Sequence, residues 1–346
     1  MLVIRADGNS AIGLGHVMRC LSIADAVKRR GKDVLFVTVC EECTDMIVQR
    51  GHQLRLLEGD YQGDSYDMIS ELPQMENLCK ELNTEITFLV DSYQVSEEYY
   101  QRLRELGKVA CLEDMGQPYT VDMLINYNIY GEDYKGAYQI KAKNTLLGAA
   151  YMPLRAEFQE DMEYVLREDV CNVMITTGGA DPYFASKAFA DAFLQSEILA
   201  KRDIVYHVVS GPLNCFAQEL KRHYSKNTSV VVHENVKSMK ALMKQCDIVL
   251  TATGSTIYEL SALGIPMICF YFAENQRRGA EAVERILGVT NAGDFSAEPS
   301  MVVQRAVDAV EKLVSDYVVR EALSRKEKAL VDGQGADRIA KALNEW

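Results

Sequence analysis

One histidine in a glycine-containing turn is the first candidate for chemistry. The turn Asn9–Arg19 has the sequence Asn-Ser-Ala-Ile-Gly-Leu-Gly-His-Val-Met-Arg and follows the apolar run Leu2–Arg5. Gly13 and Gly15 let the backbone approach a ligand closely, and a helix is expected to begin near His16. The positive end of the helix dipole disfavours an imidazolium ion there, so one ring nitrogen stays free to accept a proton. His16 is therefore a candidate general base; the alternative is that it caps the helix or donates to a carbonyl group.

Two further turns are suited to holding a diphosphate. Thr176–Asp181 contains the paired glycines Gly178 and Gly179, and Thr251–Glu259 contains a glycine followed by two hydroxyl side chains. Backbone N–H groups ahead of a helix bind phosphate without a metal ion. Glu259 lies one turn into its helix, where its carboxylate either reaches sugar hydroxyl groups or only complements the helix dipole. The alternative for both segments is a tight turn between strand and helix.

Carboxylates follow two other apolar runs, Ile86–Val90 and Val109–Leu112. Asp91 comes after the first run, and Glu113-Asp114 comes after the second. At the ends of strands these groups could orient a histidine or bind a sugar, or they only begin turns. The sequence has no Asp-x-Asp dyad and no His-x-x-x-His pair, so it predicts no catalytic metal and no cofactor.

Cys40-Glu-Glu-Cys43 has the spacing of a redox pair. The two intervening carboxylates would raise the pKa values of the thiols, and no second Cys or His pair completes a zinc site. A redox or non-catalytic function centred on this pair is the alternative from a different class. The nine cysteines are an odd, scattered set mostly within apolar runs, as free thiols are in a reducing compartment.

Short apolar runs alternate with segments of helical period, which predicts an α/β fold with parallel sheets covered on both faces. Open sheets of this kind bind ligands at the carboxyl ends of their strands. One candidate turn lies in the first half of the chain and two lie in the second, so we expect two Rossmann-like domains. The expected boundaries are 1–152 and 153–346, with two or three helices in the tail after Glu298. The apolar runs are Leu2–Arg5, Val34–Val39, Ile86–Val90, Val109–Leu112, Met123–Asn126, Val173–Thr177, Ile204–Val209, Val230–Val232, Ile248–Thr251 and Met267–Phe272.

The composition limits the class of protein. With 346 residues, 48% hydrophobic and 25% charged, the chain is globular rather than disordered or collagenous. A net charge of −13 opposes broad binding to nucleic acid or to an anionic membrane. A charge at Arg5 argues against a secretory leader, and no apolar stretch approaches the length of a membrane span. These features predict a cytoplasmic protein without stable membrane insertion; they do not predict its oligomeric state.

Several short motifs occur in one order along the chain, and that order resembles a known family. The family is that of the UDP-sugar hydrolase of pseudaminic acid biosynthesis, with relatives named after spore-coat polysaccharide proteins. The resemblance runs from Arg5 to about Gln276, and Asp332–Arg338 is similar to the close of the longer members. The motifs are Arg5-Ala-Asp7, Ile12-Gly-Leu-Gly-His16 with Arg19, Asp91-Ser-Tyr93, Leu154-Arg155 with Glu157-Phe158, Thr177-Gly-Gly-Ala-Asp181, His233-Glu-Asn235, Gly254-Ser255 with Glu259, and Asn275-Gln276.

The resemblance implies a GT-B-like architecture, in which two Rossmann-like domains face each other across a cleft, similar to the peptidoglycan glycosyltransferase that uses lipid-linked acceptors. It also implies hydrolysis of UDP-2,4-diacetamido-2,4,6-trideoxy-β-L-altropyranose by inverting attack of water at the anomeric carbon. His16 corresponds to the general base, and Tyr93 and Asn275 to the other catalytic residues on the sugar side. The residues that the resemblance assigns to the substrate are Arg5, Asp7, Gly13, Gly15, Arg19, Asp91, Arg155, Gly178, Gly179, Asn235, Val236, Ser255, Glu259 and Gln276.

Two departures from the family pattern concern the sugar. Ser92 stands where the family often has His, and Glu113-Asp114 stands where it has a pair of Asp residues. The predicted partner is a small UDP-sugar, whose diphosphate departs without a general acid because UDP is a good leaving group. The main alternative is a GT-B glycosyltransferase with a sugar or lipid acceptor. A hydrolysing epimerase is a third candidate, which would need further carboxylates at the sugar.

Overall fold

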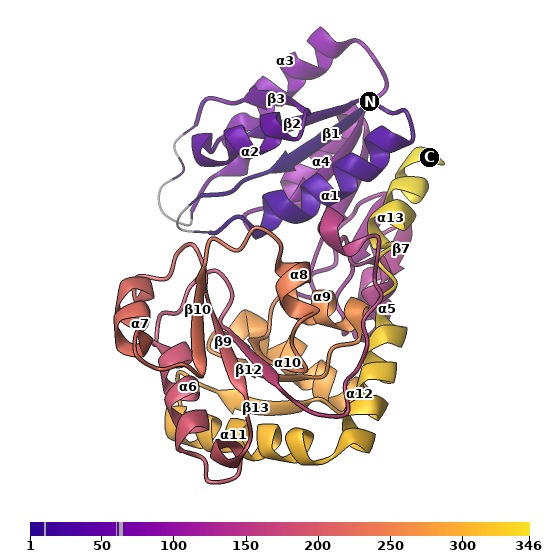
Figure 1. Cartoon of the computed structure of the whole chain (residues 1–346). Helices are drawn as coiled ribbons and strands as arrows, with labels where there is room; N and C mark the ends of the chain where they lie inside the picture. Colours follow the sequence, from indigo (N-terminus) through magenta and orange to yellow (C-terminus); the bar gives the residue numbers. More distant parts are fainter. Residues whose placement is uncertain (10–11, 60, 62–64) are drawn as a thin grey trace. The chain divides into compact units, whose positions relative to one another are not determined.

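The computed structural model describes residues 1–9, 12–59, 61 and 65–346, which form two compact units (Figure 1). Unit 1 comprises Met1–Ala156 and Gly333–Trp346, and unit 2 comprises Glu157–Asp332. Two residues of the predicted glycine turn, Ser10 and Ala11, lie outside the described residues. Each unit is a parallel sheet with helices, as the sequence predicts.

Unit 1 contains a seven-stranded sheet with the order β3-β2-β1-β4-β5-β6-β7. Every neighbouring pair of strands is parallel. All residues of β1, β2 and β4 are buried because both faces of the central sheet are covered. The strands are β1 (Leu2–Ala6), β2 (Val34–Thr38), β3 (Gln53–Leu56), β4 (Thr87–Asp91), β5 (Lys108–Leu112), β6 (Met123–Asn126) and β7 (Asn144–Leu147).

The helices of unit 1 place apolar stripes against this sheet. In α1, Val17, Leu21, Ala24 and Val27 recur at helical spacing, and all four are fully buried. The helices are α1 (Gly15–Arg29), α2 (Thr44–Gln49), α3 (Leu72–Leu82), α4 (Glu97–Leu106), α5 (Lys135–Tyr138) and α13 (Gly335–Asn344), with short 3₁₀ helices at Glu41–Cys43, Met68–Glu71, Gly131–Tyr134 and Ala149–Tyr151.

Unit 2 contains a six-stranded sheet with the order β10-β9-β8-β11-β12-β13, again with parallel pairs. Its strands are β8 (Asn172–Thr176), β9 (Val205–Ser210), β10 (Val230–Glu234), β11 (Ile248–Ala252), β12 (Met267–Tyr271) and β13 (Thr290–Asp294). Its α-helices are α6 (Ala185–Gln195), α7 (Ala217–Tyr224), α8 (Met239–Met243), α9 (Thr256–Leu263), α10 (Glu274–Leu287), α11 (Pro299–Ser315) and α12 (Tyr317–Leu330).

The last helix, α13, packs against α1 in unit 1, whereas the sequence placed the whole tail with the second domain (Figure 1). Gly335 begins α13 against the backbone, since an added Cβ there would lie 2.2 Å from the carbonyl oxygen of Met152. Arg338 donates to the carbonyl of Ala150 at 2.8 Å. The buried side of α13, which includes Ile339 and Leu343, therefore completes the core of unit 1.

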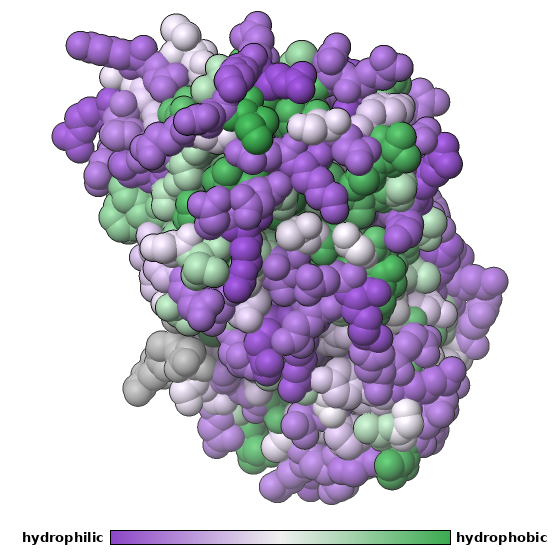
Figure 2. Space-filling model, turned by 90° about the horizontal axis from the view of Figure 1, so that it is seen from below, coloured by the Kyte–Doolittle hydropathy of each residue, from purple (hydrophilic) through white to green (hydrophobic). Residues whose placement is uncertain are grey.

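Hydrophilic side chains cover most of the face drawn in Figure 2, and hydrophobic side chains lie between them in small groups. Among the described residues, no helix combines the length and the hydropathy needed to span a membrane.

Candidate functional site

The candidate catalytic side chains of unit 1 gather at the carboxyl edge of its sheet. Because the strands are parallel, β1, β4 and β5 end at the same edge. The turn after β1 leads into α1 and His16, Asp91 ends β4, and Asp114 follows β5. Residues distant in sequence therefore meet at one place.

His16 and Asp91 form a histidine–carboxylate pair. Nδ1 of His16 lies 2.7 Å from Oδ1 of Asp91. Nη2 of Arg19, which can only donate, lies 3.1 Å from the same Nδ1. The carboxylate only accepts and is the nearer of the two partners, so we assign the ring proton to Nδ1, which donates it to Asp91. Nε2 is then the ring nitrogen with a free lone pair, which is the arrangement of a general base held in one tautomer. The side chain of His16 is 9% exposed, and its ring lies edge-on to the ring of Tyr93 with the centroids 4.7 Å apart.

Arg19 lies one turn further along α1 and fixes the other side of Asp91. Its Nε donates to Oδ2 of Asp91 at 2.5 Å, and its Nη1 donates to Oδ2 of Asp114 at 3.1 Å and to the hydroxyl of Tyr127. Burial alone would raise the pKa of Asp91, but the Arg19 guanidinium and His16 hold it well below its usual range. Asp91 is therefore a permanent carboxylate beside the imidazole.

Tyr93 is the exposed member of this group. Its hydroxyl donates to Oδ2 of Asp114 at 3.1 Å, and 52% of the residue is exposed. Burial of the hydroxyl, followed by the charge of Asp114, raises the pKa of Tyr93 well above its usual value. The phenol thus stays protonated, with its hydrogen donated to Asp114, and its oxygen can accept a hydrogen bond beside the imidazole.

Arg5 and Asp7 lie in a buried network beneath the site. Arg5 is fully buried, and its Nε and Nη2 donate to the two carboxylate oxygens of Glu71 at 2.7 Å each. Its Nη1 donates to Asp7, whose other oxygen accepts from the hydroxyl of Thr38 at 2.7 Å and the backbone N–H of Val39 at 2.9 Å. These internal hydrogen bonds of Arg5 and Asp7 hold the end of β1 in place beside His16.

In unit 2, the turn after β8 exposes backbone at paired glycines. Gly178 has a φ of +85°, and a Cβ added to Gly178 or Gly179 would meet nothing within 4 Å. Gly211 supports the turn from behind, since its own added Cβ would lie 2.2 Å from the carbonyl oxygen of Gly178. In the part of the chain that the structure describes, the buried hydroxyl groups of Thr177 and Ser210 have no hydrogen-bond partner. Buried polar groups are usually paired, so these two are suited to a ligand.

The two predicted phosphate-binding helix starts differ in the structure. At α6, the carboxylate of Asp181 accepts from the backbone N–H groups of Ala185 at 2.8 Å and Ser186 at 3.1 Å, so a carboxylate already occupies that helix start. At α9, Ser255 makes no side-chain capping hydrogen bond, and Gly254 and Ser255 are exposed. The start of α9 is therefore the better anion site.

The remaining predicted residues of unit 2 lie on the turn after β10 and on α9 and α10, which follow β11 and β12. Asn235 follows β10 in a left-handed conformation with φ of +51° and is exposed, and Val236 is half-buried. Glu259 is buried on α9. Asn275 is exposed in the first turn of α10, and the side-chain oxygen of Gln276 accepts from the backbone N–H of Phe272 at 3.2 Å.

The structure thus brings His16, Arg19, Asp91 and Tyr93 together in unit 1. Gly13 has a φ of +77° and precedes Leu14, the residue before α1, and Gly15 is the first residue of that helix. Arg155 is half-buried near the end of the first segment of unit 1. Sequence reasoning missed Tyr127 and Glu71, which have no motif of their own; Tyr127 follows β6, and Glu71 ends the 3₁₀ helix before α3.

The Cys40 and Cys43 pair lacks the properties of reactive thiols. Both are buried, and Sγ of Cys43 donates to the carbonyl of Cys40 at 3.2 Å. Burial, and then the charge of Asp7, raises the pKa of Cys40 to about 12, and burial also raises the pKa of Cys43. A raised pKa disfavours the thiolate that redox chemistry requires.

Comparison with known sequences finds one relative named for spore coat polysaccharide biosynthesis and one named as a UDP-sugar hydrolase. A family profile described as a protein of unknown function (DUF354) matches residues 117–284. The chain is 23% identical to the spore coat polysaccharide biosynthesis protein SpsG of Bacillus subtilis, with 99% of this chain and 97% of SpsG covered. It is 24% identical to the UDP-2,4-diacetamido-2,4,6-trideoxy-β-L-altropyranose hydrolase of Campylobacter jejuni, with 81% of this chain and 94% of that protein covered.

An uncharacterised protein of Methanocaldococcus jannaschii, MJ1062, is 26% identical over 80% of this chain. The chain spans only 56% of the length of MJ1062. The named relatives support a relationship to the group that contains SpsG and the C. jejuni hydrolase.

Solved structures confirm the predicted GT-B-like fold class. MurG of Acinetobacter baumannii matches with a TM-score of 0.71 at 11% identity, covering 100% of this chain and 99% of that one. The spinosyn rhamnosyltransferase SpnG matches with a TM-score of 0.64 at 12% identity, covering 98% and 99%. At these identities the likeness concerns the fold alone.

Proposed function

We propose that the protein is a nucleotide-sugar hydrolase that releases UDP from a UDP-linked diacetamido-trideoxy sugar. The observation that carries this proposal is the His16–Asp91 pair, with Nδ1 held at 2.7 Å from the carboxylate. The pair leaves Nε2 as the only ring nitrogen that can take a proton from water. The C. jejuni relative is named as a hydrolase of one such nucleotide sugar, UDP-2,4-diacetamido-2,4,6-trideoxy-β-L-altropyranose.

Water is the nucleophile in the proposed reaction. Nε2 of His16 removes a proton as the water oxygen bonds to the anomeric carbon, and the bond from that carbon to the diphosphate oxygen breaks. Asp91 stabilises the imidazolium that forms, as a carboxylate does in other histidine–carboxylate pairs. Tyr93, a neutral phenol whose hydrogen is donated to Asp114, accepts a hydrogen bond from a hydroxyl or acetamido N–H group of the sugar. A single displacement inverts the configuration at the anomeric carbon.

Unit 2 supplies the groups for the leaving UDP. Backbone N–H groups at Gly178, Gly179 and the start of α9 stabilise the negative charge that grows on the diphosphate. Asn235, Val236 and Glu259 are proposed for the rest of the nucleotide, and Asn275 for the sugar. No cluster of three or more His, Cys, Asp or Glu side chains suited to a metal ion occurs within the described ranges. Because backbone N–H groups at helix starts can hold a diphosphate by themselves, we propose binding without a metal ion.

Glycosyl transfer is the second candidate, and one observation fits it as well as hydrolysis. Leu14, Tyr93 and Met115 are 39%, 52% and 46% exposed, and they lie on the turns after β1, β4 and β5 that also carry the catalytic group. Exposed apolar side chains at a sugar site suit either an apolar acceptor or the methyl and acetamido groups of the sugar itself. A transferase retains its nucleotide sugar until an acceptor is added, so the two reactions are separable.

The first test is UDP release from UDP-2,4-diacetamido-2,4,6-trideoxy-β-L-altropyranose in the absence of any acceptor. We expect UDP and free sugar in equal amounts, at a rate that EDTA leaves unchanged. UDP-N-acetylglucosamine serves as the matched control substrate and is expected to react much more slowly. Release only after a sugar or lipid acceptor is added would establish the transferase instead, and strict dependence on Mg²⁺ would contradict diphosphate binding by backbone groups.

A further inference from the structure

Unit 1 has a second pocket at the edge of its sheet opposite the catalytic edge. The pocket has a volume of about 470 Å³ and lies where β4 and β5 begin, at Thr87 and Lys108. His16, Asp91 and Tyr93 follow the other ends of the parallel strands. The pocket is therefore separate from the candidate catalytic site and plays no part in the proposed hydrolysis.

The side chains that line this pocket carry an excess of positive charge. Lys32, Arg104, Lys108 and Lys143 face two carboxylates, those of Glu85 and Asp122. The chain as a whole has a net charge of −13, whereas the side chains of this pocket have a net positive charge. A concave site with two unbalanced positive charges attracts a small dianion.

The positive charges differ in their partners. Asp122 accepts from Nζ of Lys143 at 2.6 Å and lies 3.6 Å from Nε of Arg104, so it neutralises that side of the pocket. Nζ of Lys32 instead donates to the carbonyl of Leu343 at 3.1 Å. The ammonium group of Lys108 has no hydrogen bond or ion pair to any residue that the structure describes. Burial, followed by the charge of Lys108, lowers the pKa of Lys32, as expected for cations without a counter-ion.

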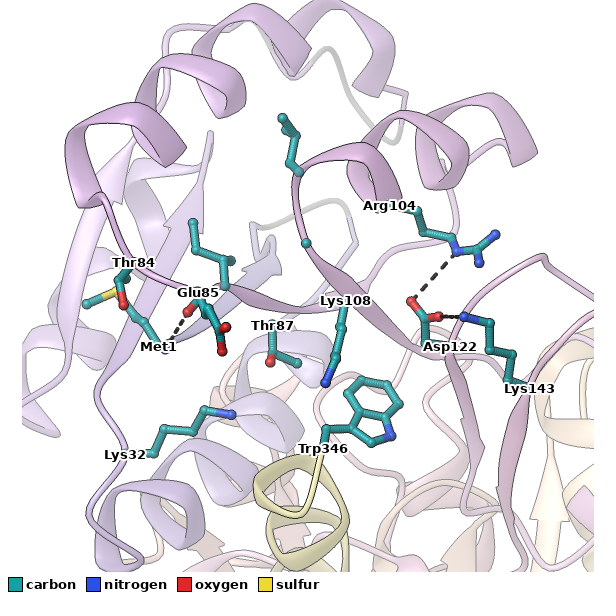
Figure 3. A pocket seen from close by; sticks show the side chains of 13 residues that line it. Met1, Lys32, Thr84, Glu85, Thr87, Arg104, Lys108, Asp122, Lys143 and Trp346 are labelled. Carbon is teal, nitrogen blue, oxygen red and sulfur yellow. Dashed lines mark hydrogen bonds and ion pairs between the residues drawn. The ribbon is translucent and has the colours of Figure 1, made fainter.

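The indole ring of Trp346 forms part of the wall beside these lysines. Figure 3 shows the ends of Lys32 and Lys108 directed into the same space, with Trp346 at the end of α13 beside them. An aromatic ring next to ammonium groups suits a ligand with an anionic end and a ring that packs on the indole face.

We propose that this pocket binds a small phosphomonoester that carries a sugar or nucleoside ring. The phosphate lies between Lys32 and Lys108, which donate charge-assisted hydrogen bonds to its oxygens. The ring of the ligand lies against Trp346. Two lysines without carboxylate partners match the two negative charges of a phosphomonoester near neutral pH.

Trp346 is the only tryptophan of the chain, so its fluorescence reports on the pocket directly. The probes are glucose 1-phosphate and UMP, with glucose, uridine and inorganic phosphate as controls. We expect a saturable change in Trp346 emission with both phosphomonoesters and none with glucose or uridine. Half-saturation by inorganic phosphate is expected at a concentration about tenfold higher or more, because it has no ring to contact the indole.

Lys32→Gln and Lys108→Gln are each expected to raise the half-saturating concentration of glucose 1-phosphate by about tenfold or more. Lys226→Gln removes the same charge from an exposed position in unit 2 and should leave it unchanged. His16→Gln should also leave it unchanged, which separates this proposal from the proposed hydrolysis.

Two results would overturn the proposal. One is the absence of a saturable response to either phosphomonoester. The other is an unaltered response in both lysine variants. The two lysines would then only complement the negative dipole ends of α1 and α4, which they follow in the sequence. An equal response to inorganic phosphate would contradict the contact with Trp346.

Discussion

His16→Gln is expected to lower kcat for UDP release by about 10²–10⁴-fold, the usual contribution of a general base. Glutamine keeps a polar side chain at the start of α1 but cannot take a proton from water. The affinity for UDP should stay near its original value, because the groups proposed for the diphosphate belong to unit 2. Steady-state kinetics and calorimetric titration with UDP measure the two effects separately.

The chain provides a matched control for this substitution. His52 also pairs with a carboxylate, with Nε2 at 2.7 Å from Oδ1 of Asp25, but it precedes β3 and is distant in the sheet from the candidate site. His52→Gln should leave kcat within about twofold of the original, with at most a loss of stability. Full turnover by His16→Gln, or an equal loss in both variants, would remove His16 from the role of base.

Asp91→Asn is expected to lower kcat by a similar factor, about 10²–10⁴-fold. An asparagine amide can donate to Nδ1 of His16, which would place the ring proton on Nε2 and remove the lone pair that takes the proton from water. It also no longer stabilises the imidazolium that the reaction forms. Because Arg19 holds the pKa of Asp91 well below its usual range, the carboxylate is ionised at neutral and mildly acidic pH in the original protein.

Asp25→Asn makes the same change in the second histidine–carboxylate pair and is the control. Breaking the buried charge pair of Asp91 with Arg19 also costs stability, on the order of 3–5 kcal/mol. Both variants are therefore assayed below their unfolding transitions, as followed by circular dichroism. If Asp91→Asn keeps its kcat while its melting temperature falls, then Asp91 is a structural partner of Arg19 and not the group that orients His16.

Most of the sheet architecture follows from the sequence because buried parallel strands are short apolar runs. The ten predicted runs correspond to β1, β2, β4, β5, β6, β8, β9, β10, β11 and β12. The three missed strands, β3, β7 and β13, are all at sheet edges. Gln-Leu-Arg-Leu in β3 and Thr-Asn-Ala-Gly-Asp in β13 are exposed or half-buried at most positions, so they carry little apolar signal.

The candidate catalytic group was partly predictable for a related reason. Strand ends at one edge of a parallel sheet must be neighbours, so Asp91 could be placed near the turn that carries His16. The sequence left open whether Asp91 orients a histidine or binds a sugar, and the 2.7 Å contact favours the first interpretation. Phosphate binding at the turn before α6 stays a prediction; the structure shows that Asp181 accepts from the first N–H groups of that helix, which leaves the backbone at Gly178 and Gly179 for an anion.

Contacts that depend on tertiary packing could not be predicted. Glu71 pairs with Arg5 across 66 positions of the sequence, and Tyr127 reaches Arg19 from the turn after β6. The return of α13 to unit 1 depends on the fit of Gly335 against Met152, which hydrophobic periodicity does not reveal. The phosphomonoester pocket has the same origin, since Trp346 joins the lysines only through that return.

The central claim is that water activated by His16 attacks the anomeric carbon. It is tested most directly by running the hydrolysis in ¹⁸O-labelled water. The account predicts that the label appears on the anomeric oxygen of the released sugar, that the first-formed anomer has inverted configuration by NMR, and that UDP remains unlabelled. Label in the terminal phosphate of UDP, or a first-formed sugar of retained configuration, would contradict it.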